Sequence, residues 1–197
     1  MAPKDLEQQL AFIIEIDKLK NVVRQTLLTD QSRRENSAEH SWHLAIMAEL
    51  LRNYAATQVD VLRVMKMVLV HDIVEIDAGD AFAYDPAANL GKSDREHQAA
   101  NRIFGLLPEE QANELRALWR EFEANATDDA RYANALDRLH PLLHNWHTEG
   151  GTWRIHKVRR DQVYRRMDPL RTATPELWPT VVDMIEQSCA KGWIATE

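Results

Sequence analysis

Two histidines and two aspartates, spread over three segments of the chain, have the side chains best suited to holding a metal ion. His40 lies in one expected helix, His71 and Asp72 are adjacent near the end of the next, and Asp137 lies in a later one. Imidazole nitrogens and carboxylate oxygens suit a divalent transition metal or Mg²⁺. Four protein ligands of this kind leave positions open for water and substrate, which is typical of a catalytic metal site.

The adjacency of His71 and Asp72 is the most informative part of this pattern. Both lie in a nearly continuous apolar run, residues 61–76, where an ionisable pair is costly unless something satisfies both side chains. A metal ion does so directly, whereas a single histidine in a helical core is more often hydrogen-bonded than metallated. Consecutive helical residues point about 100° apart. Both side chains therefore reach one ion only if it lies beside that edge of the helix.

A protease-type zinc helix is excluded by the order of residues around the first histidine. His40 and His43 stand three residues apart, but such a helix would read His-Glu-x-x-His. Here Glu39 precedes the first histidine instead.

Three later histidines offer a second metal site as an alternative. They follow one another at near-helical spacing: His140, His144 and His147. Pro141 disturbs the local hydrogen-bond ladder, and no acid is evident to complete the set. Hydrogen-bonding or surface roles are the simpler interpretation.

Helical periodicity accounts for almost the whole chain. The sequence has only six Gly and seven Pro, and no alternating run bounded by turn signals, so an all-α fold is expected. Helices are expected over residues 6–23, 37–54, 60–76, 94–106, 108–124, 128–146, 152–167 and 175–191. Ser37 and Asp60 are the expected N-caps of the second and third. Residues 29–36 and 81–93, the latter containing Pro86, are expected loops, and the second is long enough to cover a site.

The arrangement expected for these helices is one domain, residues 1–197. The chain shows no internal repeat and no second hydrophobic core, and 197 residues suffice to bury most of its apolar surface. The third helix, apolar almost all round, should lie inside the bundle.

Charge and composition limit the partners. The net charge of −7 disfavours nucleic-acid polymers, although a local basic cluster or a bound cation can still attract a small phosphorylated metabolite. The most apolar window, residues 59–76, contains several ionisable residues, so no membrane span is expected. The lone Cys189 and the absence of a secretion signal favour the cytoplasm.

Three segments carry a family resemblance. RRENSAEHSWH (residues 33–43), HDIVEIDAGD (71–80) and ALDRLHPLLHN (135–145) resemble the H…HD…D signature of the HD-domain metal-dependent phosphohydrolases. The resemblance covers roughly residues 16–145 and is closest to the small bacterial group that contains the 5′-deoxynucleotidases. It implies an HD-domain helical bundle of about seven to nine helices, with the signature in residues 33–145. The C-terminal helices, 152–191, would pack on the domain or on a dimer partner.

The resemblance also implies roles for site residues. The implied metal ligands are His40, His71, Asp72 and Asp137. Glu75 matches the acid beside the substrate, and Asp80 matches the carboxylate that holds the attacking water. Helical spacing agrees, because residues four apart share a helix face and Glu75 follows His71 by four. The turn at Gly79 can return Asp80 to the mouth of the cleft.

A single divalent metal ion is expected at this site. Two-metal HD phosphodiesterases use additional histidines between the HD doublet and the last Asp, and only His97 lies there in this chain. The same donors accept Mn²⁺, Co²⁺, Fe²⁺, Ni²⁺ or Mg²⁺.

Arginines before the second helix are the expected phosphate ligands. A guanidinium fork matches two phosphate oxygens, and Arg33 and Arg34 stand close to the first histidine in sequence. Lys92 is expected on the surface. In the deoxynucleotidases a helix-one Arg followed by Trp helps hold the nucleoside, but here Arg24 is followed by Gln25. A strict 2′-deoxy preference is therefore not expected to carry over.

The function expected from these residues is hydrolysis of the phosphomonoester of a nucleoside 5′-monophosphate by metal-activated water. Asp80 would orient or deprotonate the water and Glu75 would protonate the leaving oxygen. The alternatives are a non-catalytic regulatory protein that binds metal and nucleotide, or a cyclic-nucleotide or dinucleotide phosphodiesterase. The amphipathic segment around Trp178 suits packing on the domain or on a second subunit, and a homodimer is expected.

Overall fold

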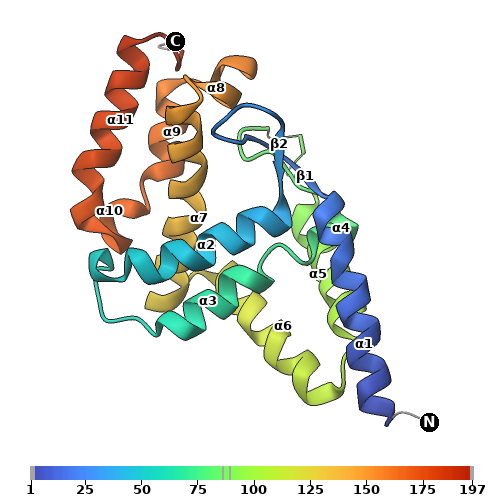
Figure 1. Cartoon of the computed structure of the whole chain (residues 1–197). Coiled ribbons are helices and arrows are strands. Elements are labelled where there is room, and N and C mark those ends of the chain that lie inside the picture. Colours follow the sequence, from blue (N-terminus) through green and yellow to red (C-terminus); the bar gives the residue numbers. More distant parts are fainter. Residues whose placement is uncertain (1–2, 86, 89, 196–197) are drawn as a thin grey trace.

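The computed structural model describes residues 3–85, 87–88 and 90–195, and these form a mainly helical fold (Figure 1). In chain order the elements are α1 (Lys4–Ile16), η1 (Asp17–Asn21), β1 (Val23–Leu27), β2 (Arg34–Asn36), α2 (Ser37–Leu50), η2 (Arg52–Tyr54), α3 (Val61–Val70), α4 (Glu75–Ala78), α5 (Lys92–Phe104), α6 (Glu109–Ala124), α7 (Asp128–His147), α8 (Gly151–Ile155), α9 (Arg160–Met167), α10 (Leu170–Ala173), η3 (Pro175–Leu177) and α11 (Trp178–Ala190). The expected helical fold class is confirmed.

Helix α7 runs through the middle of the main hydrophobic core. Helices α2 and α3 cross it on one side, α9 and α10 pack against the other, and α11 packs on α9 (Figure 1). The residues of α7 in this core include Leu136 and Leu142, both fully buried. Helix α11 buries Val181 and Ile185 in the same core, so the C-terminal helices pack on the chain itself.

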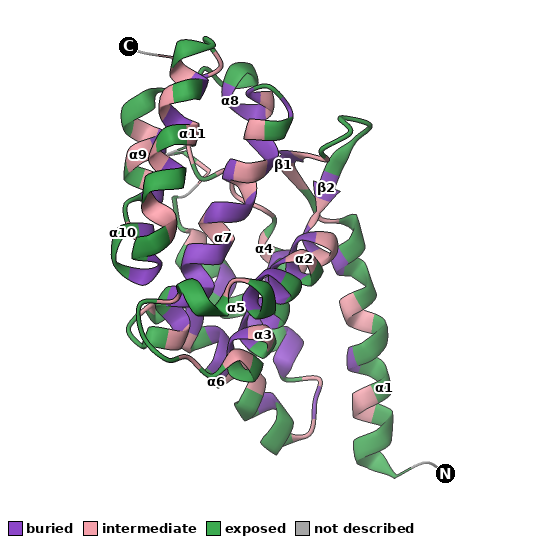
Figure 2. Cartoon of the chain, turned by 60° about the vertical axis from the view of Figure 1, so that its left-hand side comes forward, coloured by how far each residue is buried: buried purple, intermediate pink, exposed green. Residues whose placement is uncertain are grey.

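A second hydrophobic cluster lies between α1, α4, α5 and α6, contrary to the expectation of one core. Phe12, Phe104 and Trp119 are among its buried members. Helices α3 and α6 contribute to both clusters, so they join the two. Helix α1 is mostly exposed (Figure 2).

The third expected helix is shorter and less buried than its sequence indicates. Helix α3 ends at Val70, and Leu62 and Leu69 on its outer face are 65% and 46% exposed. Residues 71–77 then follow tight turns with hydrogen bonds between residues three apart, such as Glu75 N–H to Asp72 O at 2.9 Å. These turns direct the polar side chains of His71, Asp72 and Glu75 into a pocket.

A two-stranded antiparallel sheet stands where the end of the first helix and a loop were expected. Val23 pairs with Asn36 and Leu27 with Arg34, with an irregularity between the two pairs. The strands are too short to show an alternating pattern, and contacts with α7 and α8 stabilise them from outside the local sequence. The helix expected to run to residue 23 and the loop expected over 29–36 were therefore wrong at this hairpin, while the helical fold class holds.

The N-caps were predicted with mixed success. Asp60 caps α3 as predicted, since its side chain accepts the Arg63 N–H. Asn36, not Ser37, caps α2, and it forms a capping box with Glu39. Ser37 lies in the first turn, where its hydroxyl is free for another partner.

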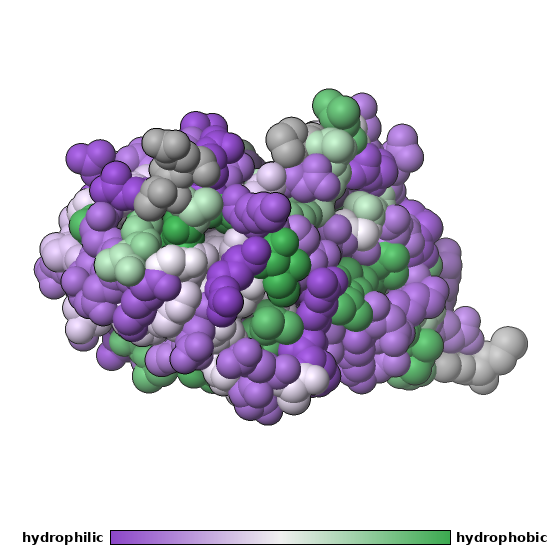
Figure 3. Space-filling view, turned by 90° about the horizontal axis from the view of Figure 1, so that it is seen from above, coloured by the Kyte–Doolittle hydropathy of each residue, from purple (hydrophilic) through white to green (hydrophobic). Residues whose placement is uncertain are grey.

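The remaining segments differ from expectation in detail. The helix expected over 152–167 is divided into α8 and α9. Residues 81–85, 87–88 and 90–91 are non-helical, as expected for a loop, whereas Pro86 lies outside the described residues. No helix within the described ranges has the length and apolarity to cross a membrane. Seen from above, the surface is mainly hydrophilic with scattered apolar patches (Figure 3).

Candidate metal centre and substrate pocket

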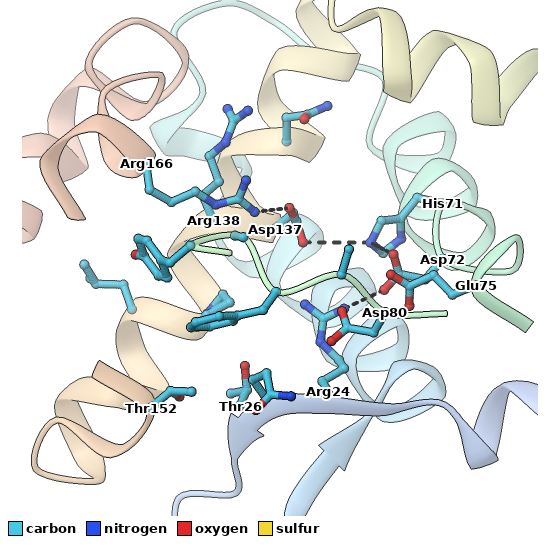
Figure 4. Close-up of a pocket in the computed structure, with 18 of the residues that line it drawn as sticks. Arg24, Thr26, His71, Asp72, Glu75, Asp80, Asp137, Arg138, Thr152 and Arg166 are labelled. Atoms are coloured by element: carbon cyan, nitrogen blue, oxygen red, sulfur yellow. Dashed lines mark hydrogen bonds and ion pairs between the residues drawn. The ribbon is translucent and has the colours of Figure 1, made fainter. Parts of the chain in front are cut away.

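A pocket of about 370 Å³ opens where β1, the turn after α3, the loop that follows α4, and helices α7 and α9 meet (Figure 4). This volume lies in the range of small-molecule sites. His71, Asp72 and Glu75 lie at one end, and Arg138 and Arg166 at the other (Figure 4). The pocket therefore has an acidic end and a basic end.

The four expected metal ligands meet at the acidic end. His40 Nε2 lies 3.1 Å from Asp137 Oδ1, and His71 Nε2 lies 3.0 Å from Asp72 Oδ1 and 3.8 Å from Asp137 Oδ1. One donor atom from each of His40, His71 and Asp72 falls in a group within 4.8 Å of one another. The tight turn after Val70 is what allows the adjacent His71 and Asp72 to face the same point.

The orientation of His71 fits a metal ion. Its Nδ1 lies 2.8 Å from the carbonyl oxygen of Val68, which only accepts, so Nδ1 carries the proton. Its Nε2 is buried and has no hydrogen-bond partner in the part of the chain that the structure describes. The Nε2 lone pair thus faces a carboxylate oxygen of Asp72 at 3.0 Å. A cation between the two satisfies both, and about 3 Å is the spacing of adjacent ligands around an octahedral ion.

Electrostatics keep His40 neutral and Asp137 ionised. Burial, reinforced by the charge of Arg24, lowers the pKa of His40 to about 3. Burial alone would raise the pKa of Asp137, but the His40 hydrogen bond and the Arg166 charge hold it well below its usual range. A neutral imidazole and an ionised carboxylate are the forms that bind metal.

Arg24, on β1, lines the acidic end of the pocket and contacts its carboxylates. Its Nη1 donates to Asp72 Oδ2 at 2.8 Å and lies 3.8 Å from Asp80 Oδ1 (Figure 4). Its Nε lies 3.5 Å from Glu35 Oε2. Asp72 and its neighbouring acids raise the Arg24 pKa despite its burial. The guanidinium balances the negative charge of the donors.

Glu75 is a buried acid with a fixed partner. Ser37 Oγ donates to Glu75 Oε2 at 2.7 Å, which joins the start of α2 to α4. Burial, together with the charge of Asp72, raises the pKa of Glu75 to about 8. The side chain therefore carries a proton at neutral pH and can donate it to a bound molecule.

Asp80 returns to the pocket through Gly79. Gly79 has a φ of 76°, a conformation that disfavours side chains, and it ends α4. Burial raises the pKa of Asp80, while Arg24 and Lys92 oppose the rise. Glu75 and Asp80 therefore place two buried carboxyl groups, both with raised pKa values, in the pocket lining.

Arg33 and Arg34 do not reach the pocket. Arg33 pairs with Glu39, with Nη2 to Oε1 at 2.6 Å, and its side chain is 53% exposed. Arg34 is also exposed, and neither residue lines the pocket among the residues described. Arg34 lies on β2, and Arg33 immediately precedes it. The structure does not support the phosphate ligands expected from the sequence.

Other basic residues line the pocket instead. They are Arg24, Lys92, Arg138 and Arg166. Arg166 Nη2 donates to Asp137 Oδ2 at 3.2 Å. Arg138 Nη1 is buried and has no hydrogen-bond partner within the described ranges. Sequence reasoning missed Arg138 and Arg166, because only the packing of α9 on α7 brings them together.

Aromatic and neutral polar side chains complete the lining. Phe82, Tyr84 and Trp153 contribute ring surfaces, and Thr26 and Thr152 contribute hydroxyl groups. Burial raises the pKa of Tyr84, so its hydroxyl remains protonated. This part of the pocket can bind a flat, partly apolar group.

The other histidines fall into two groups. His97 bonds to the carbonyl oxygen of Ser93 at 2.7 Å and packs on Trp119, and His147 and His156 are exposed. His43, His140 and His144 contact one another in a separate cluster, which His140 joins to His40.

Comparisons with known proteins agree with this geometry. The model of a family described as HD domain matches residues 16–178. The mouse protein named 5′-deoxynucleotidase HDDC2 is 30% identical over 135 residues, which cover 68% of this chain and 66% of that protein. The chain thus spans about two thirds of the length of the curated relatives it matches, 65% for the human protein of the same name.

Two solved structures resemble the fold. One, from Magnetospirillum magnetotacticum and titled a predicted metal-dependent phosphohydrolase, has a TM-score of 0.93 and 51% identity over 98% of this chain and 100% of that one. A conserved hypothetical protein from Pyrococcus furiosus has a TM-score of 0.65 and 19% identity over 92% of this chain and 99% of that one. The second likeness concerns the fold alone.

Proposed function

Since this chain belongs to the HD domain family, we propose that it is a metal-dependent phosphohydrolase that cleaves the phosphomonoester of a nucleoside 5′-monophosphate. The observation that carries the proposal is the convergence of His40, His71, Asp72 and Asp137 at the end of a pocket that also contains Glu75 and Asp80. The mouse and human relatives are named 5′-deoxynucleotidases, which supports a nucleotide substrate.

The four donors would hold one divalent ion. When bound, such an ion neutralises a phosphoryl oxygen and lowers the pKa of water. The neutral imidazoles of His40 and His71 suit Mn²⁺, Co²⁺, Fe²⁺ or Ni²⁺, and the carboxylates suit these ions and Mg²⁺. Arg24 holds the second oxygen of Asp72 and so keeps its first oxygen directed at His71.

Asp80 and Glu75 divide the proton transfers. Asp80 would accept a proton from the attacking water, because its carboxylate is stabilised by Arg24 and Lys92. Glu75 would give its proton to the leaving ribose oxygen, because burial keeps it protonated. The Ser37 hydroxyl fixes one Glu75 oxygen and leaves the other to face the substrate.

Arg138 and Arg166 would bind the charged part of the substrate. Arg166 is already tied to Asp137, whereas the buried Nη1 of Arg138 lacks a partner within the described residues. A guanidinium group in that state is stabilised by a phosphate oxygen. The aromatic rings of Phe82, Tyr84 and Trp153 would face the base.

A phosphate-release screen tests the proposal. Purified protein is incubated with ribo- and deoxyribonucleoside monophosphates and with each of the five ions, and Asp72→Ala serves as the control. We expect release that depends on the ion and is lost in the variant. Equal release by Asp72→Ala would overturn the ligand assignment, and no release under any combination would overturn the activity.

We further propose that the chain forms a homodimer through α1 and its neighbours. Leu6, Leu10, Ile13 and Ile14 on α1 are 42%, 51%, 56% and 73% exposed. Exposed apolar side chains in this number favour burial against a second copy. A cytoplasmic location is also proposed, because the single thiol has no cysteine with which to pair.

A further inference from the structure

A second group of metal-binding side chains lies beside the candidate centre but outside the pocket lining. Glu35 comes from β2, His43 from α2, and His140 and His144 from successive turns of α7. One ligand atom from each of the four lies within 4.8 Å of the others. The sequence indicated two of these histidines but no acid, and the hairpin supplies that acid from 105 positions before His140 in the chain.

Helix α7 presents its two histidines to this point because it continues through Pro141. Residues Asp128–His147 form one helix with the proline inside it. Residues four apart share a helix face, so His140 and His144 lie one above the other, with ring centroids 4.1 Å apart. The disturbance expected at Pro141 does not prevent these two histidines from sharing a face.

The distances within the group are close to those of a tetrahedral site. His140 Nε2 lies 2.9 Å from His43 Nδ1 and 3.4 Å from Glu35 Oε1. Bonds of about 2.0–2.1 Å to a zinc ion place tetrahedral ligand atoms roughly 3.3 Å apart. Small side-chain rotations bring the four atoms to that spacing.

His144 is oriented as a metal ligand. Its Nδ1 lies 2.8 Å from the carbonyl oxygen of Leu27, so Nδ1 carries the proton and Nε2 has the lone pair. Nε2 is buried and finds no hydrogen-bond partner among the described residues, and the whole residue is only 5% exposed. A buried lone pair without a donor is costly, and a metal ion satisfies it.

Glu35 offers the carboxyl group that a cation requires: burial raises its pKa to about 8, and a coordinated cation favours the ionised form. It is 1% exposed, and its Oε2 is buried without a hydrogen-bond partner in the described ranges; Arg24 Nε lies 3.5 Å from this oxygen. Glu35 Oε1 faces the histidines. A buried carboxylate of this kind is stabilised by an ion coordinated to its other oxygen.

We propose that Glu35, His43, His140 and His144 bind a second divalent metal ion, of the zinc class, in a closed tetrahedral site. Three imidazoles and one carboxylate match the ligands and coordination number that Zn²⁺ prefers. Because all four positions are filled by protein, the ion stabilises the fold rather than activating water. It ties the hairpin to α2 and α7 directly behind His40. A metal-bound His140 keeps its proton on Nδ1 and cannot accept there, so the Nδ1–H of His40 then faces Glu35 Oε2, 3.6 Å away.

The alternative is a network of hydrogen bonds without a metal. His40 Nδ1 lies 3.2 Å from His140 Nδ1, whose ring continues to His43 at 2.9 Å. Such a chain would orient His40 but would leave the Nε2 of His144 without a partner. The two arrangements differ in whether the protein retains metal once the candidate catalytic site has been removed.

The test therefore uses the double variant His71→Ala/Asp72→Ala, which removes half of the candidate catalytic ligands. The protein is loaded with zinc, dialysed against metal-free buffer, and its metal content measured by mass spectrometry. We expect one zinc per chain in the double variant, loss of that zinc when His144→Gln is added, and retention when His147→Gln is added as the control on the same helix.

Cobalt provides a measurement that does not depend on a further substitution. Co²⁺ in the double variant should give the intense visible bands of tetrahedral coordination, and His43→Gln should weaken them even if His144→Gln fails to fold. Absence of retained zinc and of tetrahedral bands in the folded double variant would overturn the proposal. Equal zinc in folded His144→Gln would overturn it as well. Because hydrolysis is not measured, failure here leaves the proposed activity untouched.

Discussion

Replacing Glu75 by glutamine tests the assignment of the general acid. Glutamine keeps the size of the side chain, and its carbonyl oxygen can still accept the Ser37 hydroxyl, now found 2.7 Å from Glu75 Oε2. The variant should therefore fold normally while losing the transferable proton. Loss of a general acid lowers kcat about 10²- to 10⁴-fold, equivalent to about 3–5 kcal/mol in the barrier.

The assay compares two leaving groups. A nucleoside monophosphate has a poor leaving oxygen that needs a proton, whereas an aryl phosphate has a good one that does not. We expect the full loss with the nucleotide and a much smaller loss with the aryl ester.

The pH dependence gives a second readout of the same step. The proton is present below the Glu75 pKa of about 8 and lost above it, so kcat for the nucleotide should fall at higher pH and Glu75→Gln should lack this limb. Glu123→Gln, another acid in the pocket lining, is the matched control and should retain activity within a few-fold. Equal kcat in wild type and Glu75→Gln with the nucleotide would refute the reasoning.

The contacts in and around the pocket lead to four further predictions. Arg138→Met should raise KM for the nucleotide about 10- to 100-fold in steady-state kinetics, since a hydrogen bond to a charged group contributes about 1.5–3 kcal/mol. Arg33→Met should leave KM unchanged; a raised KM in Arg33→Met and an unchanged KM in Arg138→Met would instead support Arg33 as the phosphate ligand. Chelation should abolish phosphate release and lower Tm, and re-adding the ion at 100 times its Kd should restore about 2.7 kcal/mol of stability by calorimetry; an unchanged Tm would show that no resident ion was removed. The pKa of Asp137 is held below its unfolded value, so its contribution to the stability of the metal-free protein should be present above about pH 4 and lost as the pH falls further. The free energy of unfolding of Asp137→Asn, measured in urea, should lack this loss. Parallel pH profiles of that free energy in wild type and variant would contradict the prediction. Ile14→Asp should shift the chain from dimer to monomer in sedimentation, and a wild-type monomer at micromolar concentration would count against the dimer.

The helices and the meeting of His40, His71, Asp72 and Asp137 could be predicted from the sequence because both depend on local or motif-like patterns. Apolar residues at helical spacing gave α6 and α7 nearly to their ends, and the capping side chain of Asp60 marked the start of α3. The adjacent His71 and Asp72 were recognisable because an ionisable pair is costly in an apolar run.

The parts that sequence reasoning missed depend on contacts between distant segments. The hairpin is too short for an alternating pattern, yet it brings Arg24 and Glu35 to the histidines. Arg138 and Arg166 reach the pocket only because α9 packs on α7. Arg33 is close to His40 in sequence, but in the structure it pairs with Glu39 instead.

The helix break after Val70 has a different origin. The apolar periodicity continues to residue 76, so the sequence indicates one helix there. In the structure the His71 ring bonds to the Val68 carbonyl oxygen, and the following backbone closes tight turns that direct Asp72 and Glu75 into the pocket. The sequence pattern does not reveal whether these residues continue the helix or form these turns.

The most direct test of the account is a crystal structure of Glu75→Gln with Mn²⁺ and a nucleoside 5′-monophosphate, with the ion located by anomalous scattering. We predict a manganese peak bonded to His40, His71, Asp72 and Asp137, with the phosphate on the ion and facing Arg138. A manganese peak away from these four residues, or a phosphate bound at Arg33 outside the pocket, would contradict it.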